Sequence, residues 1–240
     1  MLATQIKRTA RAFGIEISRA KSTRNSIGEH CALLVRLGFE PKTIIDVGAA
    51  DGTPGLYDYF PQADLLLIDP LEEHIPALEE IRRKHVKARI TLGAAGPQSG
   101  KIAINVYPDR LTGSSCLVDP CGVGGPRQVP MITVDEECRA RSLGGPYLIK
   151  IDTQGFELEV LRGASAVLEQ TEIVILEVSF FRLFTSNPIF SEVVIFMAER
   201  GFEMYDLLGS STRPLDGALA QADVVFARRN GMLRRQERFA

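Results

Sequence analysis

The sequence predicts an α/β protein built on a doubly wound, mostly parallel sheet. Three observations support this fold class. Short apolar segments such as residues 43–47 and 65–69 alternate with longer amphipathic segments. Strands of this kind are buried on both faces, which is typical of a parallel sheet covered by helices. The composition, with 45% hydrophobic and 24% charged residues, also suits a domain with a large core.

The first elements that we expect are two helices. Residues 4–21 form a basic, partly amphipathic segment. Residues 26–38 form the second helix, with Ser26 as its N-cap and Gly38 as its C-terminal stop. Pro41 then breaks the chain, so the first strand begins after it.

The expected strands are short segments that are either wholly apolar or alternate apolar and polar residues. They are residues 43–47, 65–69, 88–92, 101–107, 129–134, 147–152, 173–178, 202–208 and 223–228. Helices are expected between them at residues 71–86, 155–169 and 188–200. Residues 108–128 are rich in Gly, Ser, Pro and Asp, and long irregular segments in compact domains are usually functional or mobile.

The pattern divides the chain into three parts. We expect an N-terminal helical extension (1–40), one α/β domain (41–229) and a basic, disordered tail (230–240). The first 24 residues carry six basic side chains against one acidic side chain, and residues 228–240 carry five against one. Such ends can contact an anionic membrane surface or nucleic acid, but a solvated helix and tail explain them more simply.

The sequence also limits where the protein acts. No stretch of about 18 apolar residues predicts a membrane span, and the N-terminus lacks the apolar core of a signal peptide. The cysteines at positions 31, 116, 121 and 138 have no CxxC spacing, which indicates free thiols in a reducing compartment. We therefore expect a cytoplasmic protein.

The carboxyl ends of the parallel strands are where a doubly wound sheet binds its ligand. The loop after the first strand reads D-V-G-A-A-D-G over residues 46–52. Glycines there permit a tight turn and a close backbone approach to a ligand, although small residues can serve packing alone. An acid two residues before the first glycine disfavours a diphosphate and favours a zwitterionic or cationic ligand. The candidate ligand contacts of this loop are Asp46, Gly48, Ala49 and Gly52.

The second loop adds an acid at the end of the second strand. Asp69 ends the segment LLLID and is followed by Pro70. A carboxylate in that place can accept hydrogen bonds from the hydroxyls of a ribose, and a solvated strand-end acid is the alternative. After the third strand, Ala94 lies among small residues against which a flat base can lie. Together these loops predict an adenosine site without a phosphate site.

Two segments resemble a known family. Residues 46–52 are similar to the first motif of class I methyltransferases. The segment L-I-K-I-D-T-Q-G-F-E-L-E-V-L-R-G, residues 148–163, closely resembles the K-I-D-x-E/Q-G-x-E-x-x-V-L-x-G signature of FkbM-type methyltransferases. The resemblance extends over roughly residues 41–228. It departs from the family at Ala50, where Asn is common, and at Asp69, where Glu is common.

The resemblance implies the Rossmann-like class I methyltransferase fold, with a doubly wound, mostly parallel sheet of seven strands and with residues 41–229 as the methyltransferase domain. It implies S-adenosylmethionine as the cofactor and O-methylation of a hydroxyl on a sugar, a glycan or a small natural product. The expected partner is therefore a small-molecule or glycan acceptor and not a nucleic acid. Whether the N-terminal helices form a lid or the interface of a homo-oligomer stays open.

A hydroxyl acceptor must lose its proton, either to a general base or at a metal ion. Asp152 ends a strand beside the expected methyl position, so it is the first candidate base and also a candidate cofactor contact. Alternatively, Asp152 caps the helix that follows. Glu177 ends the next strand and is the second candidate, unless it serves a structural salt bridge. A Mg²⁺ ion held by Asp135, Asp152 and Glu177 is a further alternative.

Two other function classes stay open. An NAD-dependent oxidoreductase would share the fold, but the chain lacks G-x-G-x-x-G and carries Asp46. A non-catalytic binding module is the second class, because Ala50 replaces a polar side chain near the cofactor. Among the histidines, His74 lies nearest the cofactor edge, although a lone histidine on a charged helix is usually a surface residue.

Overall fold

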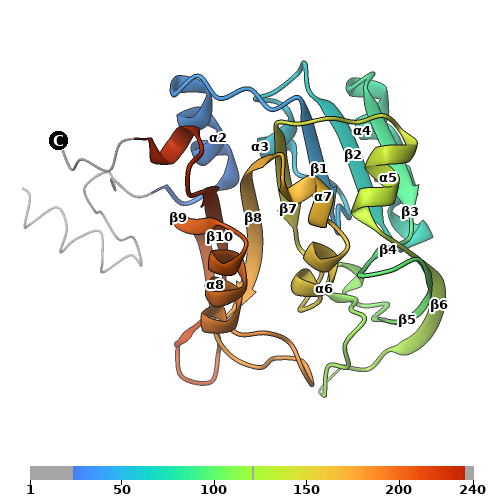
Figure 1. Ribbon diagram of the computed structural model, residues 1–240. Helices are drawn as coiled ribbons and strands as arrows, with labels where there is room; N and C mark the ends of the chain where they lie inside the picture. The colour runs from blue at the N-terminus through green and yellow to red at the C-terminus, as the bar shows by residue number, and fades with distance from the viewer. Residues whose placement is uncertain (1–23, 121, 236–240) are drawn as a thin grey trace, which may run out of the picture.

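The computed structural model describes residues 24–120 and 122–235 and contains a seven-stranded sheet in the order β3-β2-β1-β7-β8-β10-β9 (Figure 1). The strands are β1 (Thr43–Val47), β2 (Asp64–Asp69), β3 (Ala88–Leu92), β7 (Tyr147–Ile151), β8 (Thr171–Ser179), β9 (Phe202–Thr212) and β10 (Leu219–Arg228). β10 runs opposite to the other six strands of this sheet and pairs antiparallel with both β8 and β9. The predicted fold class is confirmed.

The strand order reverses direction between β1 and β7. β2 and β3 are added on one side of β1. The chain then returns to the centre of the sheet with β7, and the later strands are added on the opposite side. This reversal leaves a crevice at the carboxyl ends of the two central strands, because the loops that follow them turn to opposite faces. The ligand site is therefore expected above β1 and β7.

Helices cover both faces of the sheet (Figure 1). On one face lie α2 (Ile27–Arg36), α3 (Pro54–Tyr57) and α4 (Ile75–Lys84). On the other lie α5 (Val134–Ala140), α6 (Glu157–Arg162), α7 (Ser165–Leu168) and α8 (Phe190–Glu199). In β2, Leu65 and Leu67 pack under the first group while Leu66 and Ile68 pack under the second. This two-residue alternation, with both faces buried, explains why the strand is wholly apolar.

The α2 helix has the ends that its sequence predicts. The Ser26 hydroxyl accepts a hydrogen bond from the Glu29 amide at 3.2 Å, and Gly38 has a φ of +79° after the last turn. The helix predicted at residues 4–21 lies outside the described residues.

Two predicted elements end differently in the structure. The strand expected at 129–134 is β6 (Gly125–Ile132), and α5 begins directly after it because the Thr133 hydroxyl caps the Glu136 amide at 3.1 Å. The single helix expected at 155–169 is divided into α6 and α7. Between them, a Cβ at Gly163 would lie 2.0 Å from the carbonyl oxygen of Gly96, so the chain passes close to another backbone there.

A second, three-stranded sheet was not predicted. Its order is β4-β6-β5, with β4 (Ala94–Ala95) and β5 (Gly100–Val106) beside β6. It has its own small apolar cluster, which includes Leu71 and Ile104. Figure 1 shows this sheet at the edge of the molecule where β2 and β3 end. It therefore forms one wall of the crevice above the main sheet.

The C-terminal segment is partly described. The 3₁₀ turn η3 (Met232–Arg234) follows β10, and Met232 and Leu233 pack against the α2 face of the core. The tail expected to be disordered therefore begins with an ordered turn, and residues 236–240 lie outside the described residues. Within the described residues, no helix has the length and apolar character needed to cross a membrane.

Candidate functional site

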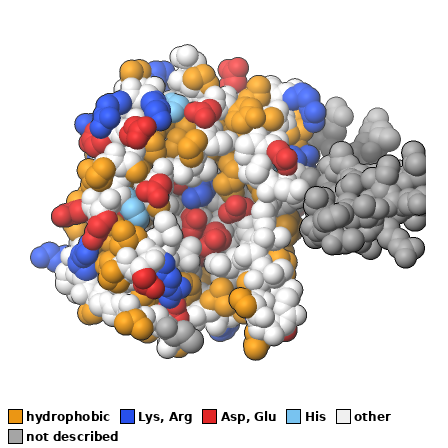
Figure 2. All heavy atoms as spheres, turned by 180° about the vertical axis from the view of Figure 1, so that it is seen from behind, with side chains coloured by type: hydrophobic (Ala, Val, Ile, Leu, Met, Phe, Trp, Pro, Cys, Tyr) orange, Lys and Arg blue, Asp and Glu red, His pale blue; other side chains and the backbone are white. Residues whose placement is uncertain are grey.

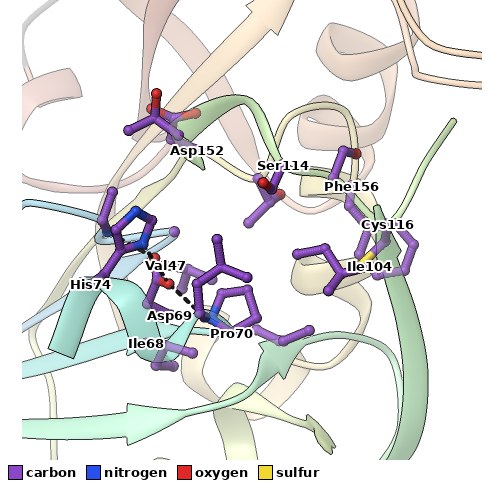
Figure 3. Close-up of a pocket in the computed structure, with 18 of the residues that line it drawn as sticks. Val47, Ile68, Asp69, Pro70, His74, Ile104, Ser114, Cys116, Asp152 and Phe156 are labelled. Carbon is purple, nitrogen blue, oxygen red and sulfur yellow. Dashed lines mark hydrogen bonds and ion pairs between the residues drawn. The ribbon is translucent and has the colours of Figure 1, made fainter. Parts of the chain in front are cut away.

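A cavity lies at the carboxyl ends of β1 and β2, beneath the small sheet (Figure 3). It encloses about 530 Å³, part of it open to solvent. Its lining includes Gly48, Asp69, Pro70, His74, Ala94, Ile104, Ser114, Asp152 and Phe156. A second hollow shares Gly48, Ala50, Thr112 and Asp152 with the first, so the two are adjacent. The cavity lies where the strand order predicts a ligand.

The loop after β1 forms a tight turn against β2 and β7. Gly48 has a φ of +72°, and its amide donates to the Ile68 carbonyl at 2.9 Å. A Cβ at Gly48 would lie 1.8 Å from the carbonyl oxygen of Asp152, so only glycine fits. Gly52 has a φ of +89°, and Ala49 is buried in the core while also lining the second hollow.

Asp69 is held in the cavity wall by three donors. Its Oδ2 accepts from the Ala50 amide at 2.8 Å, and its Oδ1 accepts from the Leu71 amide at 2.9 Å. The Nδ1 atom of His74 lies 2.9 Å from the same Oδ1. His74 is only 5% exposed, so the expectation that it lies on the surface is wrong. It is buried because η1 (Glu72–His74) turns back over the end of β2.

Asp46 lies beneath the cavity and not on its wall. The side chain is fully buried and accepts hydrogen bonds from the hydroxyls of Thr53, at 2.8 Å, and Tyr57. The Lys150 ammonium lies 3.5 Å from its Oδ1. Of the two roles that the sequence suggests for Asp46, the structure favours ordering the turn over contacting a ligand.

A row of acids crosses three neighbouring strands at the same edge. The β7, β8 and β10 registers bring Asp152, Glu177 and Asp223 to adjacent positions. All three lie on the α2 face, because the residues that alternate with them belong to the core of the opposite face. Figure 2 shows acidic side chains gathered in the middle of this face with a basic side chain among them.

Gln154 connects the two candidate bases. Its Nε2 donates to Asp152 Oδ1 at 2.9 Å and to Glu177 Oε2 at 2.8 Å, and Gln221 donates to the same Glu177 oxygen at 2.9 Å. The backbone of Gln154 has a φ of +54°, and its carbonyl accepts from the Ser115 hydroxyl at 2.7 Å. The residues 107–124 between β5 and β6 are thus attached directly to the acid row.

Burial and mutual repulsion change the ionisation of this row. Burial, followed by the charges of Asp152, Glu157 and Asp223, raises the pKa of Glu177 to about 8. Burial and then Asp152 raise the pKa of Asp223 to about 6. Burial alone would lower the pKa of Lys150, but the charges of Asp46, Asp152 and Asp223 raise it, so this lysine stays protonated.

Glu157 orders the turn that leads from β7 into α6, a helix with Phe156 at its N-cap and no side-chain capping bond. Its Oε1 accepts from the amides of Thr153, at 3.0 Å, and Gly155, at 2.9 Å. Burial raises the pKa of Glu157 to about 7, although these hydrogen bonds act to lower it. Because no side chain caps α6, the helix-cap alternative for Asp152 is wrong, and Asp152 instead lines both hollows.

Asp135 lies elsewhere, which contradicts the metal site suggested with Asp152 and Glu177. Its carboxylate accepts from the amides of Ala166, at 3.0 Å, and Val167, at 2.9 Å, and so starts α7. Among the described residues, no group of three His, Cys, Asp or Glu side chains is placed to hold a metal ion.

The lining fits S-adenosylmethionine by its chemistry. The first cavity is lined by Asp69 and Asp152, and no Lys or Arg lines it within the described part of the chain. A diphosphate would meet these acids without a compensating cation, whereas a sulfonium and an ammonium group would be favoured. Apolar side chains such as Ile104 and Phe156 offer a surface for a flat base opposite Asp69 (Figure 3).

Sequence reasoning missed three residues of this site, Gln154, Gln221 and Asp223, and misjudged the burial of His74. Gln154 lies inside the 148–163 signature, so its position was visible but its link to Glu177 was not. Asp223 and Gln221 come from a strand about 70 residues further on, which adjoins β8 only through the antiparallel pairing. His74 was judged from its charged neighbours alone.

Comparison with known proteins gives a family and several solved structures. The model of the methyltransferase FkbM domain matches residues 46–204, which confirms the resemblance. Among curated protein sequences, none matches this chain.

The solved structures are similar at low identity. Magnesium protoporphyrin IX methyltransferase from Synechocystis PCC 6803, with bound S-adenosylmethionine, has a TM-score of 0.47 and 13% identity, over 84% of this chain and 77% of that chain. The N-terminal domain of EvdMO1, in the presence of S-adenosylhomocysteine and D-fucose, has a TM-score of 0.47 and 12% identity, over 95% and 97%. A putative RNA methyltransferase from Pyrococcus horikoshii has a TM-score of 0.46 and 14% identity, over 94% and 98%.

Proposed function

Because this chain belongs to the FkbM family of S-adenosylmethionine-dependent methyltransferases, we propose that it methylates a hydroxyl oxygen of a sugar, a glycan or a small natural product. The observation that carries the proposal is the pair Asp152 and Glu177, joined by the Gln154 amide at the edge of the cofactor cavity. A carboxylate held in this way can take the proton of a hydroxyl.

The cofactor would lie across the carboxyl ends of β1 and β2. Asp69 would accept from the ribose, Pro70 and Ala94 would border the base, and the Gly48 turn would leave room for the amino-acid end beside Asp152. When bound, the cofactor supplies a methyl group on a positively charged sulfur. The chain's own residues must orient the acceptor, exclude water and remove one proton, and orientation alone can lower the barrier by about 7–11 kcal/mol.

Glu177 is the stronger candidate for the base. Its Oε2 is fixed by Gln154 and Gln221, which leaves Oε1 as the acceptor for a proton. Its raised pKa suits proton transfer from a weakly acidic hydroxyl better than an ordinary carboxylate does. Asp152 is the alternative base, and the Lys150 ammonium lies 3.5 Å from its Oδ2.

The surroundings of the acids favour a hydroxylated acceptor. Carboxylates and amides alternate along this edge, with Gln154 and Gln221 on either side of Glu177. Such groups can pair with neighbouring hydroxyls as both donors and acceptors. The family membership favours a methyltransferase over an NAD-dependent oxidoreductase. Methyl transfer to any acceptor would exclude the non-catalytic binding module. The interface of a homo-oligomer and the role of the N-terminal extension stay predictions.

The proposal is tested by methyl transfer from labelled S-adenosylmethionine to panels of sugars, glycosides and hydroxylated natural products, with matched amine and thiol acceptors. We expect label in an O-methyl ether, located by mass spectrometry. Transfer to amines or thiols alone would contradict the proposal. Addition of EDTA is expected to leave the rate unchanged, because the acids above and not a metal remove the proton.

Asp69→Asn is expected to weaken S-adenosylhomocysteine binding by about tenfold or more. The substitution replaces one carboxylate oxygen with an NH2 group, which is a donor. Either the Ala50 amide or the Leu71 amide then loses its acceptor and faces another donor. Calorimetric titration measures the dissociation constant, and Asp64→Asn, at the opposite end of β2, serves as the control. Equal affinity of Asp69→Asn and the wild type would exclude Asp69 from the cofactor site.

A further inference from the structure

His74 and Asp69 form a pair in the wall of the cofactor cavity. Figure 3 shows the imidazole ring beside the Asp69 carboxylate, with the dashed contact joining them. The contact is 2.9 Å between Nδ1 and Oδ1, and both side chains are almost fully buried. A ring held in this way has a fixed tautomer when it is neutral, because Nδ1 must carry the proton that it donates.

Asp69 alone cannot accept hydrogen bonds from both hydroxyls of a ribose. A carboxylate offers about four lone-pair positions, two on each oxygen. The Leu71 amide and His74 occupy both positions of Oδ1, and the Ala50 amide occupies one position of Oδ2. One position on Oδ2 is left, whereas the ribose of the cofactor presents two neighbouring hydroxyls. The second hydroxyl needs another partner.

The free partner beside Asp69 is Nε2 of His74. This atom has no hydrogen bond to any described residue, and His74 lines the cavity. It is not sealed off within the protein, in contrast to Nε2 of His30, which is buried without a partner. In the neutral ring, the proton on Nδ1 leaves Nε2 with a lone pair that accepts from a hydroxyl. The hydrogen bond to Asp69 raises the pKa of His74, and in the protonated ring Nε2 donates to the hydroxyl oxygen instead.

We propose that His74 is a second ribose-binding residue, whose Nε2 atom binds the hydroxyl that Asp69 leaves without a partner. Asp69 and His74 then act as one clamp, in which the carboxylate holds one hydroxyl and also orients the ring for the other. The inference rests on the cofactor and on the Asp69 assignment, and it is independent of the methyl acceptor.

The test measures S-adenosylhomocysteine binding by calorimetry, with the 2′-deoxy and 3′-deoxy forms of its ribose as second ligands. His74→Asn keeps a donor near the position of Nδ1 but cannot reach the ligand, so we expect about three- to tenfold weaker binding of the intact ligand. One deoxy ligand is expected to bind His74→Asn and the wild type equally, because the hydroxyl that His74 would bind is already missing. His85→Asn, at the opposite end of the same helix and outside the cavity, is expected to bind as the wild type.

A second variant separates contact with the ligand from support of Asp69. His74→Gln keeps a polar group near the position of Nε2 but loses the Nδ1 donor. If His74 only oriented Asp69, His74→Gln would be the weaker binder, His74→Asn would bind normally, and the proposal would be overturned. The proposal would also be overturned if His74→Asn bound all three ligands more weakly than the wild type by the same factor. Asp69→Asn binding as tightly as the wild type would instead show that the assignment beneath the inference is wrong.

Discussion

Replacing Glu177 with glutamine is expected to lower kcat by about a hundredfold to ten-thousandfold, because the variant has no carboxylate to take the acceptor proton. Glutamine has the same shape, and its carbonyl can still accept from Gln154 and Gln221, so the fold should not change. Single-turnover kinetics with labelled cofactor measures the loss, once an acceptor is known. S-adenosylhomocysteine should bind with unchanged affinity, because Glu177 does not line the cofactor cavity.

The matched control is Glu169→Gln, an exposed position before the same strand, which should keep full activity. If Glu177→Gln turned over at the wild-type rate, Glu177 would not be the base, and Asp152 would take its place as the candidate. Loss of cofactor binding in Glu177→Gln would point to a structural role.

The pH dependence gives the same assignment a second readout. The pKa of Glu177 is raised to about 8, mainly by burial, so most of this side chain is protonated and inactive as a base at neutral pH. The ratio kcat/KM should therefore rise with pH up to about 8 and level off above it, because the charged form accumulates as pH passes the pKa. Glu177→Gln should lack this rise, whereas Glu169→Gln should retain it.

Gly48→Ala is expected to lower the free energy of unfolding by about 4 kcal/mol or more, one of the largest effects of a single methyl group. Two costs add at this position. The φ of +72° is unfavourable for any residue with a Cβ, and that Cβ would lie 1.8 Å from the Asp152 carbonyl oxygen. Relief requires β1 and β7 to separate at the end where the ligand binds. Urea denaturation measures the loss, and cofactor binding should disappear with it.

Gly38→Ala separates the two costs. Gly38 has a φ of +79°, but nothing lies within 4 Å of the position of its Cβ. Its substitution should cost about 1 kcal/mol, which is the backbone penalty alone. If Gly48→Ala were no less stable than Gly38→Ala, the close approach of the β1 turn to Asp152 would be wrong.

Local patterns in the sequence identified most of the main sheet. Segments such as 65–69 are wholly apolar because both faces of a central strand are covered, and that property can be seen without knowing the neighbours. The errors lie at boundaries. Thr133 ends a strand and starts a helix through one hydroxyl contact, and Gly163 divides a helix because another backbone passes there.

The acid row shows the limit of the same reasoning. Asp152 and Glu177 were found because both end strands at the carboxyl edge of the sheet, where a doubly wound sheet binds its ligand. Their partner Asp223 could not be found, because it joins them only through the pairing of β8 with β10. Asp135 had the same local appearance as the other acids, yet its carboxylate serves the start of α7.

The sequence by itself determined the fold class, the family and the edge of the sheet where the cofactor would bind. These follow from residue order within short segments, since alternation, glycine spacing and strand-end acids are local properties. The tertiary structure alone decided that Asp46 lies beneath the cavity, that His74 lies in its wall and that Gln154 connects two carboxylates. These depend on contacts between strands that are distant along the chain, because the direction and partners of a side chain are fixed by packing and not by its neighbours in sequence.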